Sequence, residues 1–270
     1  MITSRRLKTL RWYARRPLLW KQFFRFVREK SSGPSSEQDV QATRAAARAW
    51  CAEVAVPIDV AIERITGQSG VLSLAELHPD EVAHGARLQT DCPVKMGSGV
   101  NIDLLYTLAE AIACTRAVET GVAFGWSSFA LLESVSRREG RLISTDMPYP
   151  LRDNDAFVGC VVPERLRRFW TLLRMPDRDG LPGALRRLRP LDLAHYDSDK
   201  SVEGRNWAYP RLWEALRPGG VFVTDDVQDN LAFRDFAAAV GCAPVVAAIP
   251  ERGDFKYSGI LIKPRHPAVS

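Results

Sequence analysis

One stretch, residues 118–146, constrains the fold most, because strand, glycine turn, helix and second strand follow one another in it without interruption. The first strand is expected over 116–120. Gly121 and Gly125 bracket the turn, where glycine lets backbone approach a ligand closely because no Cβ stands in the way. The second strand ends on Asp146. The first two strands of a doubly wound sheet end side by side, so Asp146 is expected beside the glycine turn.

The helix between these strands is expected to begin at Ser127 and Ser128. Serine is a preferred N-cap residue, because its hydroxyl accepts a hydrogen bond from a backbone N–H group of the first turn. An apolar face then recurs at helical spacing, formed by Phe129, Leu131, Leu132 and Val135.

The glycine spacing bears on the ligand. A pyrophosphate-binding turn has the pattern G-x-G-x-x-G, whereas this turn reads E-x-G-x-x-x-G from Glu119 to Gly125. An acidic residue there repels a pyrophosphate but suits a cationic ligand. S-adenosylmethionine (SAM) carries a sulfonium and an α-amino group; Glu119 suits the amino group, and Asp146 can hold the ribose hydroxyls. The alternative is an ordinary strand–turn–helix unit with tolerated glycines, but the position of Asp146 favours SAM.

Beyond Asp146 the sequence alternates between strand and helix patterns. A helix over 101–114 leads into the first strand and is expected to carry no chemistry. Later strands are expected over 170–173, 191–196, 221–224, 245–249 and 257–262, the last two joined as a hairpin. This alternation predicts an α/β fold with a Rossmann-like, seven-stranded and mostly parallel sheet, preceded by an N-terminal helical extension.

Composition divides the chain into three expected parts. Residues 1–39 form a basic segment and a Ser/Gly/Pro linker, 40–98 a helical cap region, and 99–270 the main domain. The five cysteines are scattered singly, which indicates reduced thiols in the cytoplasm rather than a disulfide framework or a zinc site. No apolar run reaches membrane-spanning length.

The N-terminal segment carries the basic character of the chain. Residues 1–30 hold ten Lys or Arg and one acid, a net charge of +9, so the other 240 residues sum to −4. The main domain is therefore not expected to bind nucleic acid. From Pro17 a helix is expected whose apolar face holds Trp20, Phe23, Phe24 and Val27. Either this basic helix attaches to an anionic surface on the inner face of a membrane, or it packs on its own domain or on the partner subunit of a homodimer.

Carboxylates gather after two of the expected strands. Asp197 follows the strand over 191–196, and Asp225 and Asp226 follow the strand over 221–224. If these strands are neighbours, their ends lie roughly 4.8 Å apart. An all-oxygen ligand set suits Mg²⁺, Ca²⁺ or Mn²⁺ rather than zinc, and a cation relieves the repulsion between adjacent carboxylates. The alternative is that these aspartates are solvated loop residues that cap the following helices.

Lys200 and His195 lie near the same strand end. A bound cation beside Lys200 would lower the pKa of its ammonium group and let it act as a base toward an acceptor hydroxyl; the alternative is a surface lysine. A histidine on a buried strand is more often a satisfied core residue than a base. His195 is nevertheless kept with Lys200 and Asp197 as a catalytic candidate.

Four segments taken together resemble a known family: V-E-T-G-V-A-F-G-W-S-S (118–128), I-S-T-D-M-P (143–148), Y-D-S-D-K (196–200) and L-R-P-G-G-V-F-V-T-D-D-V (216–227). They are similar to the class I SAM-dependent O-methyltransferases related to catechol and caffeoyl-CoA O-methyltransferases. A V-P-E-R-L segment (162–166) and a K-Y-x-G-I-L-x-K-P ending (256–264) are similar to a bacterial branch, methyltransferase family 24. The resemblance covers about residues 95–264.

The resemblance implies roles for single residues. It places SAM contacts at Glu119, Gly121, Ser127 and Asp146, with Gly125 in the same turn. It places the metal ligands, with Mg²⁺ as the expected ion, at Asp197, Asp225 and Asp226, and it matches Lys200 to the catalytic lysine.

Three features bear on this resemblance. Asp226 stands where the catechol type has asparagine. R-M-P-D-R-D (174–179) replaces the usual G-D adenine element, which leaves Asp177 as the candidate for that contact. The chain has no N-P-P-Y-like element, which argues against methylation of amino groups on bases.

The predicted reaction is transfer of the SAM methyl group to an oxygen, with a metal that orients the acceptor hydroxyl and lowers its pKa. We expect a sugar hydroxyl on a glycan or glycolipid, because few aromatic residues precede the sheet to stack a planar phenol and the basic helix can hold the enzyme near lipid-linked material. A phenol or catechol is the second candidate acceptor. A non-catalytic SAM-fold binding protein at the membrane is the third interpretation, and Asp197, Lys200 and Asp225 argue against it.

Overall fold

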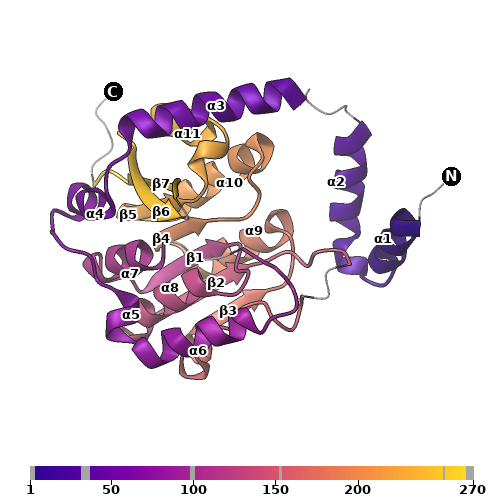
Figure 1. Ribbon diagram of the computed structural model, residues 1–270, viewed down its shortest axis with the longest axis horizontal. Coiled ribbons are helices and arrows are strands. Elements are labelled where there is room, and N and C mark those ends of the chain that lie inside the picture. The colour runs from indigo at the N-terminus through magenta and orange to yellow at the C-terminus, as the bar shows by residue number, and fades with distance from the viewer. Residues whose placement is uncertain (1–3, 32–36, 98–100, 152–153, 252, 266–270) are drawn as a thin grey trace.

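The structure, a computed structural model, describes residues 4–31, 37–97, 101–151, 154–251 and 253–265. Its centre is a seven-stranded sheet with the strand order β3-β2-β1-β4-β5-β7-β6 (Figure 1). The first five strands of this order are parallel, and β7 pairs antiparallel with both β5 and β6. The predicted fold class is therefore confirmed: a Rossmann-like sheet of class I methyltransferase topology, closed by one antiparallel hairpin.

The strands are short and mostly buried. Their bounds are β1 Arg116–Thr120, β2 Arg141–Thr145, β3 Trp170–Leu173, β4 Leu191–Tyr196, β5 Leu216–Thr224, β6 Val245–Glu251 and β7 Asp254–Ile262. The helices that follow the N-terminal segment are α3 Glu37–Val54, α4 Ile58–Thr66, α5 Leu74–Leu77, α6 Pro79–Thr90, α7 Ile102–Ala111, α8 Trp126–Ser136, α9 Asp177–Leu188, α10 Val202–Ala215 and α11 Ala232–Ala239, with 3₁₀ turns η2 Glu164–Phe169 and η3 Val227–Asp229.

Two hydrophobic layers cover the sheet because side chains alternate between its faces along each strand. Ala117 and Leu142 pack with α4, α7 and α8 on one face. Val118 and Ile143 pack with α9, α10 and α11 on the other. The residues predicted as a separate cap therefore contribute to the main core through α4.

Three strands are longer than the sequence predicted. The strand expected over 245–249 ends at Glu251, and the strand expected over 257–262 begins at Asp254. The strand expected over 221–224 begins at Leu216, so the turn-like residues Pro218-Gly219-Gly220 lie inside β5. Leu216 already pairs with Leu191, and the ladder shifts register before Val221 pairs with Leu193, so the turn residues form an irregularity within a continuous strand.

The N-terminal segment consists of α1 Ser4–Ala14, η1 Pro17–Leu19 and α2 Trp20–Ser31, and it lies beside the main body (Figure 1). Its small core holds Trp12, Tyr13 and Leu19, and Phe23 packs against it. Phe23 therefore points away from the exposed apolar face that the sequence predicted for it. Arg25 of α2 pairs with Asp179 of α9 at 2.9 Å, which ties the segment to the main domain.

Candidate active site

The glycine turn after β1 packs against the end of β4. Gly121 has φ +81°, and a Cβ at this position would lie 2.2 Å from the carbonyl oxygen of Asp197. Gly125 has φ +98°, and its Cβ would lie 2.8 Å from the Cα of Gly159. The sequence predicted that these glycines allow a ligand to approach the backbone closely. Contacts within the protein already require glycine at both positions.

Helix α8 begins without a serine cap. Gly125 is the N-cap residue, and no side chain caps the first turn. Ser128 lies inside the helix, and its hydroxyl donates a 2.5 Å hydrogen bond to Glu119. The predicted N-cap role of Ser127 and Ser128 is therefore wrong: the chain enters the helix through a left-handed glycine, and the hydroxyl of Ser128 is used inside the core.

Asp146 lies beside the glycine turn, as its position after β2 predicted. Its Oδ2 accepts hydrogen bonds from the backbone N–H groups of Val122 at 2.9 Å and Ala123 at 3.1 Å. Arg174 pairs with its other oxygen and also reaches Asp155 at 2.6 Å. The carboxylate therefore fixes the shape of the turn.

Glu119 is fully buried and lies away from open space. Besides Ser128, it accepts a 2.8 Å hydrogen bond from Ser144 and lies 3.4 Å from Nδ1 of His195. In this position Glu119 has no exposed surface with which it could contact a ligand directly.

His195 links two carboxylates. Its ring is completely buried, and Nε2 lies 3.1 Å from Asp225 while Nδ1 faces Glu119. Burial alone would lower the pKa of His195, but the charges and hydrogen bonds of Asp225 and Glu119 raise it to about 10. The raised pKa favours a protonated ring between the two carboxylates, and this buried position suits a positioning role; the catalytic role expected from the sequence stays a prediction.

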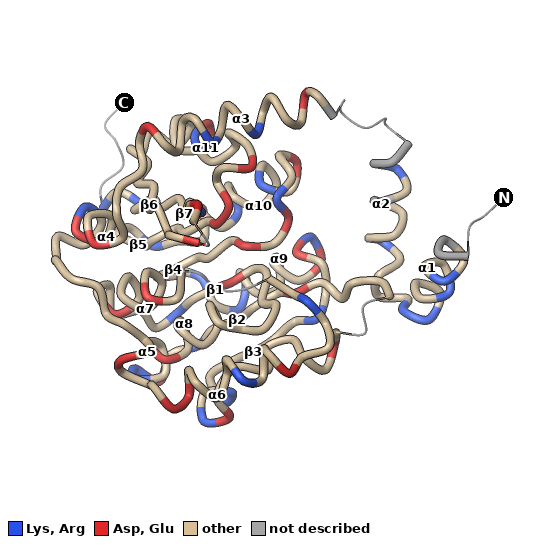
Figure 2. The backbone as a smooth tube through the Cα atoms, in the orientation of Figure 1, with Lys and Arg blue, Asp and Glu red and all other residues tan. Residues whose placement is uncertain are grey.

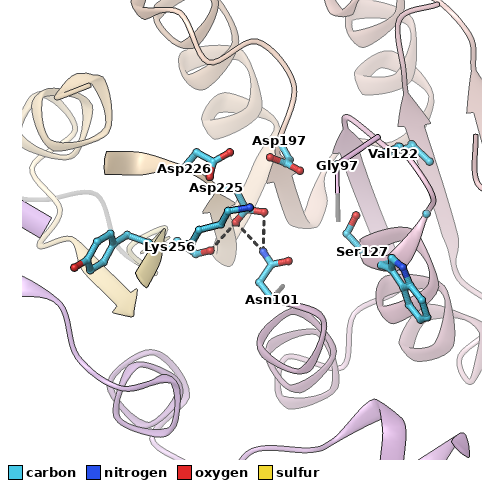
Figure 3. Close-up of a pocket in the computed structure, with 13 residues that line it drawn as sticks. Gly97, Asn101, Val122, Ser127, Asp197, Asp225, Asp226 and Lys256 are labelled. Atoms are coloured by element: carbon cyan, nitrogen blue, oxygen red, sulfur yellow. Dashed lines mark hydrogen bonds between the residues drawn. The ribbon is translucent and has the colours of Figure 1, made fainter. Parts of the chain in front are cut away.

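Asp225 is held by neutral donors as well. Asn101 donates to its two oxygens at 2.7 and 2.8 Å, and Ser258 donates at 2.6 Å (Figure 3). Burial would raise the pKa of Asp225, but His195 lowers it below its ordinary value. Asn101 is the N-cap residue of α7, the helix that was expected to carry no chemistry, and its hydrogen bonds bring the start of this helix to the carboxylate of Asp225.

Lys200 lies between the other two carboxylates. Its Nζ contacts Asp197 and lies 3.0 Å from Asp226. Burial would lower the pKa of Lys200, but Asp197, Asp226 and Asp225 raise it above its usual value. Lys200 therefore keeps its proton in this arrangement, and the role of base that was expected beside a bound cation stays a prediction.

Asp177 begins α9 and is enclosed by hydroxyl groups. It accepts hydrogen bonds from Thr145 at 2.8 Å and from Ser198. Burial raises its pKa above the ordinary value, while these two hydrogen bonds oppose the rise. The residue joins the ends of β2 and β4 and does not reach the open cleft.

An open cleft of about 510 Å³, solvent space at its mouth included, lies over the strand ends (Figure 3). On one side it is lined by the glycine turn and the start of α8, including Ser127. On the other it is lined by Asp197, Asp225, Asp226, Asn101, Lys256 and Ser258. The cleft therefore joins two groups of predicted residues, those for the cofactor and those for the acceptor.

Comparison with known proteins agrees with this geometry. The family model described as "Methyltransferase domain" matches residues 118–227, from β1 to η3. This segment is therefore similar to that methyltransferase family. The match and the fold confirm the resemblance to class I methyltransferases that the sequence motifs indicated. A search of curated proteins found no match.

Solved structures share the fold of this chain. The cofactor-bound protein Rv0187 from MTB is 20% identical with a TM-score of 0.57, covering 71% of this chain and 94% of that chain. The O-methyltransferase TomG from Streptomyces achromogenes, solved with SAM and involved in tomaymycin synthesis, is 18% identical with a TM-score of 0.54, covering 76% and 96%. An O-methyltransferase from Bacillus cereus, solved with S-adenosylhomocysteine (SAH), is 15% identical with a TM-score of 0.53, covering 83% and 100%.

Four residues of the cleft and its surroundings were missed by sequence reasoning: Asn101, Arg205, Lys256 and Ser258. Arg205 is fully buried in α10 and donates to the backbone carbonyls of Asp225 at 3.1 Å and Asp226 at 2.7 Å. Lys256 and Ser258 stand in the K-Y-x-G motif, which served only as a family signature. Asn101 and Arg205 carried no local signal, because their partners lie far away in the sequence.

The donor chemistry of the cleft fits a hard divalent cation. Asp197, Asp225 and Asp226 present carboxylate oxygens, the ligands that Mg²⁺ prefers, and the Lys200 ammonium already lies among them as a cation. Their oxygens are not gathered as a group within 4.8 Å of one another. Within the described ranges only His78, Glu81 and Glu133 form such a group, and Arg165 already bridges both glutamates.

Proposed function

We propose that this chain is a SAM-dependent O-methyltransferase whose acceptor is a hydroxyl group of a sugar, on a glycan or a glycolipid. The observation that carries the proposal is the single cleft, in which the glycine turn and a group of carboxylates face the same space. The family match supports methyl transfer, and the matched O-methyltransferases support an oxygen acceptor.

In the proposed reaction the acceptor oxygen attacks the methyl carbon of SAM in line with the sulfur. The carbon–sulfur bond breaks, SAH leaves, and the hydroxyl proton passes to a carboxylate of the cleft. The glycine turn would bind the cofactor, and Asp146 would fix that turn through the N–H groups of Val122 and Ala123. Alignment of the two reacting groups supplies much of the rate.

Asp197 is the proposed partner of the acceptor hydroxyl. Its side chain is 37% exposed, against 24% for Asp226 and 14% for Asp225. It would accept the hydrogen bond that orients the hydroxyl and take its proton. A divalent cation, when bound, would be held by Asp197 and Asp226 beside Asp225, and it would polarise the acceptor oxygen.

The polarity of the cleft favours a sugar over a phenol. The acceptor side offers carboxylates, an amide, a hydroxyl and an ammonium group, all of which bond to hydroxyl groups. Its aromatic residues, Trp126 and Tyr257, are each only 8% exposed, so they offer little ring surface on which a planar acceptor could stack. A phenol or catechol remains the second candidate, and a non-catalytic SAM-binding protein the third.

Calorimetry and methyl transfer test the proposal. The protein is expected to bind SAM, and Asp146→Ala should weaken binding at least tenfold, about 1.4 kcal/mol, because the glycine turn loses its anchor. The control is Asp155→Ala, which removes the exposed second partner of Arg174 and should change SAM affinity less than about twofold. Equal SAM affinity in the wild type and Asp146→Ala would contradict the cofactor assignment.

The acceptor is then identified with SAM that carries a labelled methyl group. We expect label in sugars or glycolipids and none in phenols or catechols. Label in phenols alone would favour the second candidate. SAM binding with no transfer to either panel would favour the non-catalytic interpretation.

We further propose that the enzyme works in the cytoplasm at an anionic membrane surface, which it contacts through α1, η1 and α2. Leu18 is 83% exposed, Phe24 65% and Trp20 49%. Lysine and arginine residues recur along both helices (Figure 2). A basic surface with exposed aromatic and aliphatic side chains suits an anionic bilayer interface. Among the described residues no helix is both long and apolar enough to cross a bilayer.

Sedimentation with liposomes tests this location. The full-length protein should sediment with vesicles that contain anionic lipid, and less as salt rises, because salt screens surface charges. The double variant Leu18→Ser, Phe24→Ser should remain in the supernatant. The control is Leu77→Ser on α5, which removes an aliphatic side chain of 52% exposure outside the basic segment and should sediment like the wild type. No sedimentation of the wild type would indicate a segment that only packs on protein.

A further inference from the structure

Lys200 occupies the position in the cleft where a cation is needed. Its Nζ bridges Asp197 and Asp226, which come from the ends of two neighbouring strands. We propose that the Lys200 ammonium is a resident counter-ion that a divalent metal displaces, so that lysine and metal compete for the same carboxylates. This inference rests on the proposed function, because it concerns the cation that would assist methyl transfer in the same cleft.

The backbone around Lys200 is fixed, so that displacement requires movement of its side chain alone. The N–H group of Asp197 donates to Thr120 at 2.8 Å, and Asn230 donates to the carbonyl oxygen of Lys200 at 2.8 Å. The lysine stem has four methylene groups and several rotamers, so Nζ can leave the carboxylates without moving the loop.

The carboxylates divide into one fixed member and two exchangeable members. Asp225 is held by Asn101, Ser258 and His195, and these bonds satisfy both of its oxygens. Among the described residues, Lys200 is the one cation that pairs with Asp197 and Asp226. Replacement of the lysine ammonium by a metal would therefore change the surroundings of Asp197 and Asp226 and leave Asp225 in place.

Calorimetric titration with Mg²⁺ and Mn²⁺ tests the exchange. Lys200→Met is expected to bind the metal at least tenfold more tightly than the wild type, because the competing cation is gone. The matched control is Lys256→Met, which removes a lysine that lines the same cleft but pairs with Glu251 at 3.2 Å. That variant should change metal affinity less than threefold. Equal or weaker metal binding by Lys200→Met, or no binding by either protein, would overturn the proposal.

Labelling of amines in the wild type gives a second readout if Lys200→Met does not fold. Bound metal should raise the modification of Lys200, measured by mass spectrometry, several-fold, while Lys256 changes little. Unchanged labelling of Lys200 at saturating metal would also overturn the exchange. SAM titration of the same samples separates the two proposals: normal SAM binding without exchange rejects this inference alone, and absent SAM binding rejects the proposed function.

Discussion

Replacement of Gly121 by alanine is expected to destabilise the fold by about 2–5 kcal/mol and to abolish SAM binding. Two costs add. The residue has φ +81°, where a side chain costs roughly 1–2 kcal/mol, and the new Cβ would lie 2.2 Å from the backbone of Asp197. Overpacking of this kind costs about 1–3 kcal/mol more. The clash cannot relax easily, because Gly121 N–H bonds to Thr145 and Asp197 N–H bonds to Thr120, each at 2.8 Å.

The control for Gly121 is Gly67, at the end of α4. Gly67 has φ +71°, and a Cβ added there would meet nothing within 4 Å, so Gly67→Ala carries the conformational cost without the clash. We expect about 1 kcal/mol and unchanged SAM affinity. Denaturant unfolding and calorimetry measure both quantities. Similar losses of stability in the two variants would show that the contact with Asp197 contributes nothing.

The sequence predicted the sheet well because its strands are buried runs between punctuating glycines. The bounds of β1 to β4 match the predicted ranges. The start of β5 was missed because Pro218-Gly219-Gly220 has the composition of a turn. In the structure the strand continues through these residues, since Leu216 finds a partner in β4 before the turn. Local composition does not reveal a pairing that a distant strand supplies.

The sequence predicted those residues of the candidate site that directly follow a strand. Asp146 and Asp197 stand at strand ends, and topology alone brings strand ends to one edge. The partners of Asp225 could not be found in this way, because Asn101 lies 124 residues away from it. The sequence predicted a cofactor contact for Glu119 and a catalytic role for His195. In the structure the two buried side chains lie against each other. The ring of His195 in turn contacts Asp225, which lines the cleft.

Replacement of Asp197 by alanine separates the role of the carboxylate from the role of the backbone at this position. Asp197→Ala is expected to reduce methyl transfer at least about 100-fold, the scale on which a positioned acid or base acts. SAM affinity should stay within about threefold of the wild type. The reason is that the contact with Gly121 and the hydrogen bond to Thr120 use backbone atoms of Asp197, which alanine retains.

The isosteric variant Asp197→Asn decides whether the carboxylate acts by charge or by shape. The amide keeps the size of the side chain and its ability to hydrogen-bond, but it cannot take a proton from the acceptor and no longer carries the charge that Lys200 faces. If the proposal is right, Asp197→Asn is as inactive as Asp197→Ala, whereas Asp235→Ala, which removes an exposed aspartate on α11, keeps full activity. Activity and SAM affinity are measured on the same acceptor. Recovery of activity in Asp197→Asn would mean that Asp197 only fills space, and the proton would then need another carboxylate of the cleft, with Asp226 the next most exposed.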